Sequence, residues 1–464
     1  MFDIASRLKK LKLPLIVFVI LSAAFVMLAA FLTGDTIRRG VRIENTDVSG
    51  LSVVEARKLL TESVNERYSG GSFSLSYDER EWRFGLDRIS YRFLADEAVS
   101  KAFSVGRTGG IFTKTFRAVS LLADNLTLEI GTEYDRDKLI GILNNIKSEI
   151  NTKETNAAVS YKSGKIMLAQ DSGGLRLDVD RSLKLVENHL RERDFDRIEL
   201  AADNVKPSVT YDSIKDIDTV LSLFSTTFNP GDINRSDNIR LACSRLDGRI
   251  LMPGEEFSMN EALGPRTIEN GYKEAPVIYK NELIKGPGGG ICQVTTTLYD
   301  AVLLSRLKVL ERSHHSMPLG YVRPGQDATI AEDSIDFRFV NSFDYPVSLA
   351  AEVIRDKIYI RILGRAGPEA YVVKLVSEII AEYPPGEDEI EVDDSLADGQ
   401  RVVAREGRTG LRAVLYRDTY SADGVLLGRE KISEDYYKPS KGLIKVNSNY
   451  YVQYLLFTKE LQNE

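Results

Sequence analysis

Histidine and cysteine, the usual ligands of zinc, are scarce in this sequence. Its 464 residues include only three histidines and two cysteines. A zinc site needs about three protein ligands, and His314 and His315 are adjacent instead of four residues apart on a helix face. The acidic stretch at residues 386–399 also lacks the ligand spacing of an EF-hand loop. We therefore expect neither a metal nor another cofactor.

Signals for nucleotide or nucleic-acid binding are missing as well. The glycine-rich stretch GPGGG at residues 286–290 is not followed by the Lys-Ser/Thr pair of a P-loop. Lysine and arginine number 61 against 68 aspartates and glutamates, and both signs are interspersed along the chain, which gives a net charge of −7. This pattern predicts no basic surface, so nucleic acid is not an expected partner.

Cysteine is too scarce for a disulfide framework, although exported proteins usually pair their cysteines. Cys243 recurs with Ile239 and Ala242 at helical spacing, which is typical of a small apolar residue on a buried helix face. The alternative is a disulfide between Cys243 and Cys292.

Long apolar runs are absent except for one near the N-terminus. Residues 13–34 are nearly uncharged and long enough to cross a bilayer as a helix. Basic residues precede the run, so we expect residues 1–12 to be a cytoplasmic tail and the bulk of the chain to be extracytoplasmic. The prediction is a single-pass protein of the cell membrane. A cleaved signal peptide is the alternative.

The length and the order of elements predict a multidomain α+β protein, because one core of this size is unusual. After the membrane helix, we expect two small α+β repeats, a mixed α+β catalytic domain, a glycine-rich β-domain and a C-terminal tail. Their predicted ranges are 40–131, 132–210, 211–364, 370–447 and 448–464. Within the first repeat, Ser52 with Glu55 three residues later predicts a capped helix start.

One of the two cysteines follows three glycines in GPGGGICQVTTTLYDAVLL, residues 286–304. Consecutive glycines can adopt positive φ and let the backbone approach a ligand closely. The apolar residues that follow have helical spacing, so Cys292 is predicted at or just before the first turn of a buried helix. The amides and dipole there favour the thiolate. Cys292 is thus a candidate nucleophile, with Gly289, Gly290 and Gln293 as candidate substrate-binding residues.

A thiolate nucleophile needs a partner that accepts and donates a proton. His314 and His315 lie together about twenty residues beyond the cysteine in the sequence. Asp327 and Asp336 follow them and could orient an imidazole.

Several motifs then occur in an order typical of one known family. The motifs are FSMNEALGPRTIENGYKEAPVI, GGGICQVTTTLYDAVLLSRLKVLERSHHSMP, YVRPGQDATI, DFRFVN and YPVSLAAEV. Together they closely resemble the VanW domain, over about residues 214–364. The two upstream repeats are similar to peptidoglycan-binding units, and the tail resembles the small glycine-rich β-domain of exported cell-wall proteins.

The resemblance implies a cell-wall enzyme, since some members of this family are thought to be L,D-transpeptidases with a cysteine nucleophile. By motif position, the family's cysteine corresponds to Cys292, its histidine to His315 and its aspartate to Asp327. His314 stands where the family often has proline, so we predict His315 as the base and His314 as a neighbour in the substrate site.

Three functions follow as hypotheses. The first is a cysteine acyl-transferase that forms 3→3 crosslinks between peptidoglycan stem peptides; the second is a peptidase of the same peptides. The third is a non-catalytic peptidoglycan-binding scaffold or a glycopeptide-resistance accessory protein. A stem peptide carries a free carboxylate, for which Arg266 and Arg323 are candidate partners. We favour Arg266, because the adjacent proline and nearby glycine suggest a fixed loop.

Overall fold

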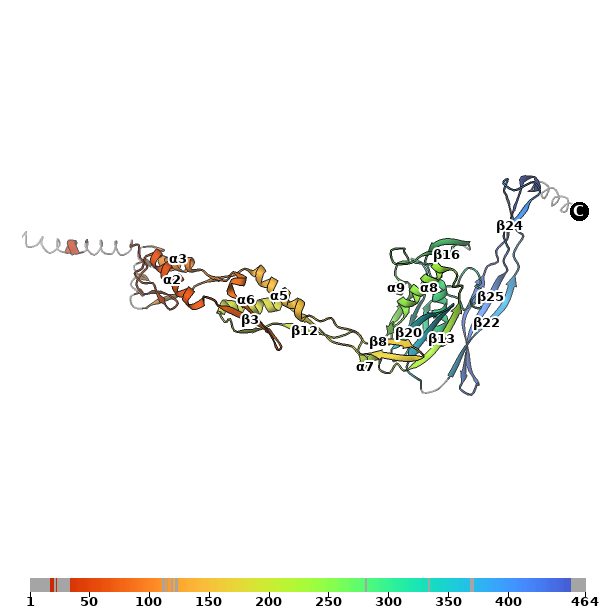
Figure 1. Cartoon of the computed structure of the whole chain (residues 1–464), viewed down its shortest axis with the longest axis horizontal. Helices are drawn as coiled ribbons and strands as arrows, with labels where there is room; N and C mark the ends of the chain where they lie inside the picture. Colours follow the sequence, from red (N-terminus) through yellow and green to blue (C-terminus); the bar gives the residue numbers. More distant parts are fainter. Residues whose placement is uncertain are drawn as a thin grey trace, which may run out of the picture. The chain divides into compact units, whose positions relative to one another are not determined.

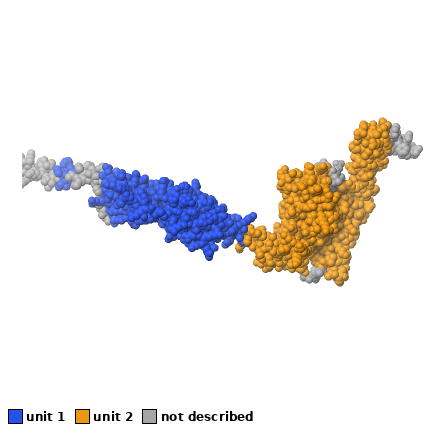
Figure 2. All heavy atoms as spheres, viewed as in Figure 1, with its two compact units in different colours: residues 1–153, 173–205 blue, residues 154–172, 206–464 orange. Residues whose placement is uncertain are grey.

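The computed structural model describes most of the chain, in two compact units (Figures 1 and 2). The described residues are 17–20, 22, 34–110, 113–114, 116–117, 120–121, 124–279, 282–332, 334–367 and 371–451. Unit 1 comprises residues 1–153 and 173–205, and unit 2 comprises residues 154–172 and 206–464. The predicted tail at 1–12 and most of the predicted anchor at 13–34 lie outside the described residues. Within the described part, no helix is long and apolar enough to cross a bilayer.

Unit 1 is built from short strands and four longer helical segments among its described residues. The helices are α2 (Val53–Tyr68), α3 (Ala95–Ser104), α5 (Arg136–Ile150) and α6 (Val179–Glu192), with the 3₁₀ turn η1 (Leu86–Ile89). The strands are β1 (Val41–Ile43), β2 (Thr46–Asp47), β3 (Ser72–Tyr77), β4 (Arg80–Gly85), β5 (Arg92–Phe93), β6 (Leu126–Leu128), β7 (Thr132–Glu133), β10 (Gly174–Leu177), β11 (Arg197–Glu199) and β12 (Ala202–Val205). The predicted start of α2 is confirmed: Ser52 and Glu55 form a reciprocal capping box.

The two predicted repeats are not separate in unit 1. Strand β11, from the second predicted repeat, pairs in parallel with β3 from the first, with Ile198 opposite Leu75. Phe73 and Leu75 share a buried cluster with Leu139 of α5 and Leu183 of α6. The apolar face of the β3–β4 hairpin is therefore covered by helices that follow it by more than fifty residues, which the order of elements does not reveal.

Unit 2 begins with a hairpin that the sequence assigned to the second repeat. The hairpin is formed by β8 (Ala158–Lys162) and β9 (Lys165–Ala169). Val159 is buried with Ile214, Ala350 and Leu363, all of which lie beyond residue 210. The division between the units therefore differs from the predicted boundary at residue 210.

The central part of unit 2 is a four-stranded antiparallel sheet in the order β13-β21-β20-β14, against which α8 and α10 pack. Side chains of α8, α10 and the sheet form one large buried cluster. The helices are α7 (Tyr211–Ile214), α8 (Ile233–Leu246), α9 (Met259–Leu263) and α10 (Ile291–Leu304). The strands are β13 (Thr219–Thr227), β14 (Ile250–Leu251), β15 (Glu256–Ser258), β16 (Glu274–Tyr279), β17 (Glu282–Pro287), β18 (Lys308–Glu311), β19 (Arg338–Val340), β20 (Val347–Ile354) and β21 (Lys357–Gly364).

The C-terminal part of unit 2 is formed by strands alone within residues 371–446. Strands β22 (Tyr371–Tyr383), β25 (Gly410–Ser421) and β26 (Leu426–Tyr437) make one antiparallel sheet. Strands β23 (Glu389–Val392), β24 (Arg401–Arg405) and β27 (Leu443–Val446) make a second. This confirms the predicted α+β multidomain class with a small C-terminal β-domain. Leu415 of β25 is buried in the same cluster as α10, so the two parts of unit 2 share a core.

Candidate active site

The glycine run shapes the backbone just before α10. Gly288 and Gly290 have φ of +85° and +105°, a region that side chains disfavour, and Gly290 is the N-cap of the helix. At Gly289, an added Cβ would lie 2.5 Å from the carbonyl oxygen of Pro276. Only glycine fits these positions, so the loop can turn sharply into the helix and present Cys292, the second residue of α10.

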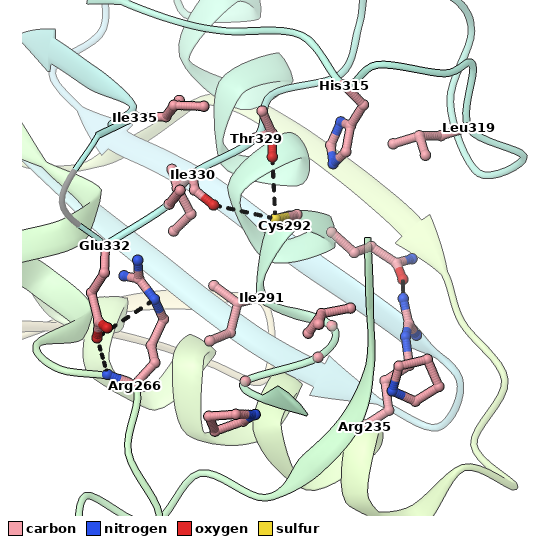
Figure 3. A pocket seen from close by; sticks show the side chains of 18 of the residues that line it. Arg235, Arg266, Ile291, Cys292, His315, Leu319, Thr329, Ile330, Glu332 and Ile335 are labelled. Atoms are coloured by element: carbon pink, nitrogen blue, oxygen red, sulfur yellow. Dashed lines mark hydrogen bonds and ion pairs between the residues drawn. The ribbon is translucent and has the colours of Figure 1, made fainter. Parts of the chain in front are cut away.

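Cys292 is the partly exposed member of an otherwise buried first turn. Its neighbours Ile291 and Gln293 are 2% exposed, and Val294 is fully buried. The thiol faces a cavity of about 750 Å³ (Figure 3). The cavity is lined by Arg235, Arg266, Pro276, Val277, residues 287–293, residues 314–316, Leu319, Tyr321, residues 329–332 and Ile335. The Sγ atom lies 3.5 Å from the hydroxyl oxygen of Thr329 and 3.9 Å from the carbonyl oxygen of Ile330.

His315 and Asp327 are joined to each other beside this thiol. The Nδ1 atom of His315 lies 2.8 Å from Oδ2 of Asp327, and the backbone N–H of His315 donates to the same oxygen at 2.6 Å. Both side chains are almost fully buried. The imidazole ring lies beside Cys292 in Figure 3. The structure thus brings the three predicted catalytic residues together.

The electrostatics of the three groups favour a charged pair. Desolvation opposes a thiolate at Cys292, but the hydrogen bond and charge of His315 outweigh it and lower the pKa of Cys292 to about 7. Desolvation likewise opposes an imidazolium, yet the bonds to Asp327 and Cys292 raise the pKa of His315 to about 9. Between these two pKa values, the dominant form is a Cys292 thiolate beside a His315 imidazolium. Because the two groups interact, each pKa describes the pair and not one residue alone.

Asp327 has further partners that the sequence reasoning missed. The hydroxyl of Tyr437 donates to its Oδ1, and Arg312 lies 3.4 Å from the same oxygen. Arg312 also pairs with Asp435 at 2.7 and 2.8 Å. Burial opposes ionisation of Asp327, but the bonds from His315, Tyr437 and Arg312 outweigh it and lower its pKa. Tyr437 follows Asp327 by 110 residues, so no local signal indicated this contact.

The other histidine and the other aspartate have different roles. The Nδ1 atom of His314 bonds to the backbone carbonyl of His315 at 2.6 Å, and the residue lines the cavity as a neighbour. Asp336 instead accepts from the hydroxyl of Ser258 and from the backbone N–H of Asn260 at the start of α9. Asp327 is therefore the carboxylate that bonds to the imidazole.

The disulfide alternative is wrong for this structure, because Cys243 and Cys292 are both free thiols. Cys243 is 2% exposed in the core, as its helical spacing predicted. Burial raises its pKa to about 12, so it is far less reactive than Cys292.

The two arginines at the cavity, Arg235 and Arg266, differ in whether an acidic side chain lies near them (Figure 3). Arg266 bonds to Oδ1 of Asn260 at 2.8 Å and lies 4.0 Å from the carboxylate of Glu332. Arg235 bonds to the side-chain oxygen of Gln293 at 2.6 Å, and it forms no ion pair with any acidic residue of the described chain. The predicted residue Gln293 is buried, and its amide also bonds to Thr226, so it holds Arg235 at the cavity wall.

A thiol at a helix start, an imidazole and a buried carboxylate form the arrangement found in nucleophilic cysteine catalysis. Residues 234–363, which contain all three groups, match the VanW like protein family. This match confirms the predicted resemblance of the region to the VanW domain. Residues 82–199 match a peptidoglycan binding domain family, across both predicted repeats, and residues 376–448 match the G5 domain family.

Two curated proteins resemble part of this chain. Protein YoaR of Bacillus subtilis (strain 168) is 40% identical over 157 residues, which cover 34% of this chain and 52% of that protein. The vancomycin B-type resistance protein VanW of Enterococcus faecalis (strain ATCC 700802 / V583) is 28% identical over 142 residues, covering 30% of this chain and 52% of that protein. The chain spans about half the length of the curated relatives it matches.

A solved structure also matches part of the chain. An IgA1 protease G5 domain is 21% identical to this chain and covers 18% of it, with 98% of that domain aligned and a TM-score of 0.13.

Proposed function

We propose that this protein is an L,D-transpeptidase-type cysteine acyl-transferase, which joins peptidoglycan stem peptides through 3→3 crosslinks. The supporting observation is the open cavity at Cys292, where His315 lowers the pKa of the thiol to about 7. A packed structural cysteine has no need of such a setting, as Cys243 illustrates. The match to a peptidoglycan binding domain supports the substrate class. Because peptidoglycan lies outside the cytoplasmic membrane, this function requires an extracytoplasmic location, with residues 13–34 as the anchor.

In the first half-reaction, the Cys292 thiolate attacks a stem-peptide carbonyl and forms a carbon–sulfur bond. The oxygen that becomes negative forms at the N-terminus of α10, where the helix dipole stabilises negative charge. The amides of Ile291 and Gln293 donate to Gly288 and Gly290, so this dipole is the main contribution of the helix. The carbon–nitrogen bond then breaks, and the His315 imidazolium gives its proton to the departing D-amino acid's amine. Asp327 holds the ring through its Nδ1–H.

In the second half-reaction, the amine of a neighbouring stem attacks the thioester. His315, now neutral, takes the proton from this amine while the carbon–sulfur bond breaks. The products are a new amide and the original thiolate–imidazolium pair. A water molecule in place of the amine would give the peptidase reaction.

The leaving end of the donor carries a carboxylate, and Arg235 is better placed for it than Arg266. Arg266 is already engaged by Asn260 and lies near Glu332. The charge of Arg235 faces the same cavity as Cys292 and is balanced by no acidic side chain of the described residues. A guanidinium can bind a carboxylate through two parallel hydrogen bonds.

A second candidate is a non-catalytic peptidoglycan-binding protein or a glycopeptide-resistance accessory. The comparisons favour it more than catalysis, because the family names describe binding and one curated relative is named for vancomycin resistance, while none names a reaction. In that case the site around Cys292 would bind a stem peptide without cleaving it.

Product analysis separates these candidates. Purified protein is incubated with disaccharide-tetrapeptide, and the products are identified by mass spectrometry. Transfer gives a crosslinked dimer together with the free D-amino acid, and hydrolysis gives only the shortened monomer. If the wild-type protein binds the substrate but forms no product, the result supports the non-catalytic binding role. Cys292→Ala is the inactive reference, and Cys243→Ser is the matched control that keeps activity.

A further inference from the structure

The buried carboxylate at the candidate site is held from two different domains. Asp327 and its partners His315 and Arg312 lie within the VanW-like region at 234–363. Tyr437 lies at the end of β26, within the G5 region at 376–448. The side chain of Tyr437 is fully buried.

Tyr437 connects two groups of the turn that carries Asp327: a backbone N–H of the turn and the carboxylate of Asp327 itself. Its hydroxyl accepts from the backbone N–H of Gly325 at 2.8 Å and donates to Oδ1 of Asp327. The turn also approaches β25 closely, since a Cβ on Gly325 would lie 3.1 Å from the Cβ of Leu415. Asp327 thus has its Oδ2 on His315 and its Oδ1 on Tyr437.

Asp435, two residues earlier on β26, acts on the same carboxylate through Arg312. Both its oxygens bond to Nη1 of Arg312, whose side chain is 8% exposed. Without this second carboxylate, the positive charge of Arg312, 3.4 Å from Asp327, would be balanced by Asp327 alone. Arg312 would then destabilise the nearby His315 imidazolium, which has the same charge. Asp435 therefore leaves Asp327 free to stabilise His315.

Other titratable groups face this cluster from α10. Tyr299 and Asp300 are both buried, and the ring of Tyr299 lies 5.2 Å from the guanidinium carbon of Arg312. Burial raises the pKa of each, which favours the neutral form of both side chains. The charges that act directly on His315 are those of Cys292 and Asp327, while Arg312 acts on Asp327 and is paired with Asp435. Tyr321, which lines the cavity, also faces Cys292 and Asp327, and burial raises the pKa of its phenol.

We propose that the C-terminal G5 region completes the active site, with Tyr437 and Asp435 as positioning residues for the Asp327–His315 pair. This rests on the proposed function for its catalytic consequence only. The effect on the Cys292–His315 pair itself can be measured without any peptidoglycan substrate.

A purely structural role is the competing explanation, because Tyr437 also packs against the ring of His314, at 5.0 Å between centroids. The two roles differ in their effect on titration. Asp435→Asn removes a negative charge and lowers the pKa at which His315 loses its proton. Tyr437→Phe keeps the ring but removes a donor from Asp327, so the carboxylate holds the imidazolium more strongly and this pKa rises. A structural contact predicts no such opposite shifts.

The experiment measures the rate of Cys292 alkylation by iodoacetamide against pH in the full chain, with thermal melting of each variant. Two inflections are expected, the lower from the thiol and the upper from the imidazolium. We expect the upper inflection to fall for Asp435→Asn, to rise for Tyr437→Phe and to recover towards wild type for Asp435→Glu. The matched control is Tyr436→Phe, whose half-exposed ring stacks edge-on with Tyr383; it should leave the profile unchanged.

Two outcomes overturn the proposal. One is a lower melting temperature with an unchanged alkylation profile in both Tyr437→Phe and Asp435→Asn. The other is a shift in the same direction in both variants. If Tyr437→Phe does not fold, the profile of Asp435→Asn alone decides. With a tetrapeptide donor, acylation of Cys292 should slow by on the order of tenfold in each variant, because a small misplacement of the base is costly. A wild type that shows the two inflections but no acylation refutes the proposed function and leaves the positioning role standing.

Discussion

His315 and Asp327 are bonded twice, since the ring Nδ1 and the backbone N–H of His315 both contact Oδ2 of Asp327, at 2.8 and 2.6 Å. The double contact fixes both the position of the backbone and the orientation of the ring. Because Nδ1 is occupied by the carboxylate, Nε2 is the nitrogen left to exchange a proton with Cys292.

The first prediction is the pH dependence of the thiol. Since the pKa of Cys292 is lowered to about 7, its alkylation rate should rise through pH 7, below the range of an ordinary thiol. Asp327→Asn removes the charge that stabilises the imidazolium, so the thiol inflection should move up. Alkylation followed by peptide mass spectrometry measures this site separately from Cys243. An inflection that stays in place in Asp327→Asn would refute the coupling of the three groups.

The second prediction concerns the buried acid at Asp300. Its side chain is fully buried, and burial raises its pKa well above the usual value. The folded state therefore keeps a proton that the unfolded state loses, so this group costs stability as pH rises above its unfolded pKa of about 4. Asp300→Asn should therefore raise the free energy of unfolding at pH 7. The gain should vanish near pH 3 in urea titrations. An equal effect at both pH values would show that ionisation is not its cause.

The third prediction concerns the carboxylate of the donor peptide. Arg235→Gln should raise the KM for a tetrapeptide stem far more than for the same peptide with an amidated C-terminus. Arg266→Gln is the matched control, because Arg266 lines the same cavity but already contacts Asn260 and lies near Glu332. It should change the two KM values to similar extents. If the selective effect belongs to Arg266→Gln instead, the carboxylate binds on the other side of Cys292.

The fourth prediction concerns the glycine turn before α10. Gly290→Ala places a Cβ 3.0 Å from both Cγ of Arg235 and Cγ1 of Ile239, at a φ of +105°. The backbone strain alone costs about 1–2 kcal/mol, and the crowding adds to it. Chemical denaturation should show at least this loss. Gly428→Ala is the control, since Gly428 has open space around its Cβ position and no positive φ. Equal stability of the two variants would contradict the steric account.

The sequence predicted the parts of the site that depend on local patterns. The glycines before Cys292 and the helical spacing after it indicated the start of α10, and the motif around His315 and Asp327 indicated that this histidine and this carboxylate lie together. Arg312, Asp435 and Tyr437 were missed because their contacts depend on packing between distant segments. The pairing of β11 with β3 was missed for the same reason, because the residue pattern of one strand does not determine which strand it pairs with.

The most direct test of the central claim is the mass of the intact protein after brief exposure to a tetrapeptide stem. We predict a covalent adduct with the mass of the donor less its terminal D-amino acid, located on the peptide that contains Cys292. The adduct should be absent in Cys292→Ala and present in Cys243→Ser. A wild-type protein that binds the stem peptide but never forms this adduct, under conditions where iodoacetamide modifies Cys292, would contradict the proposed catalysis.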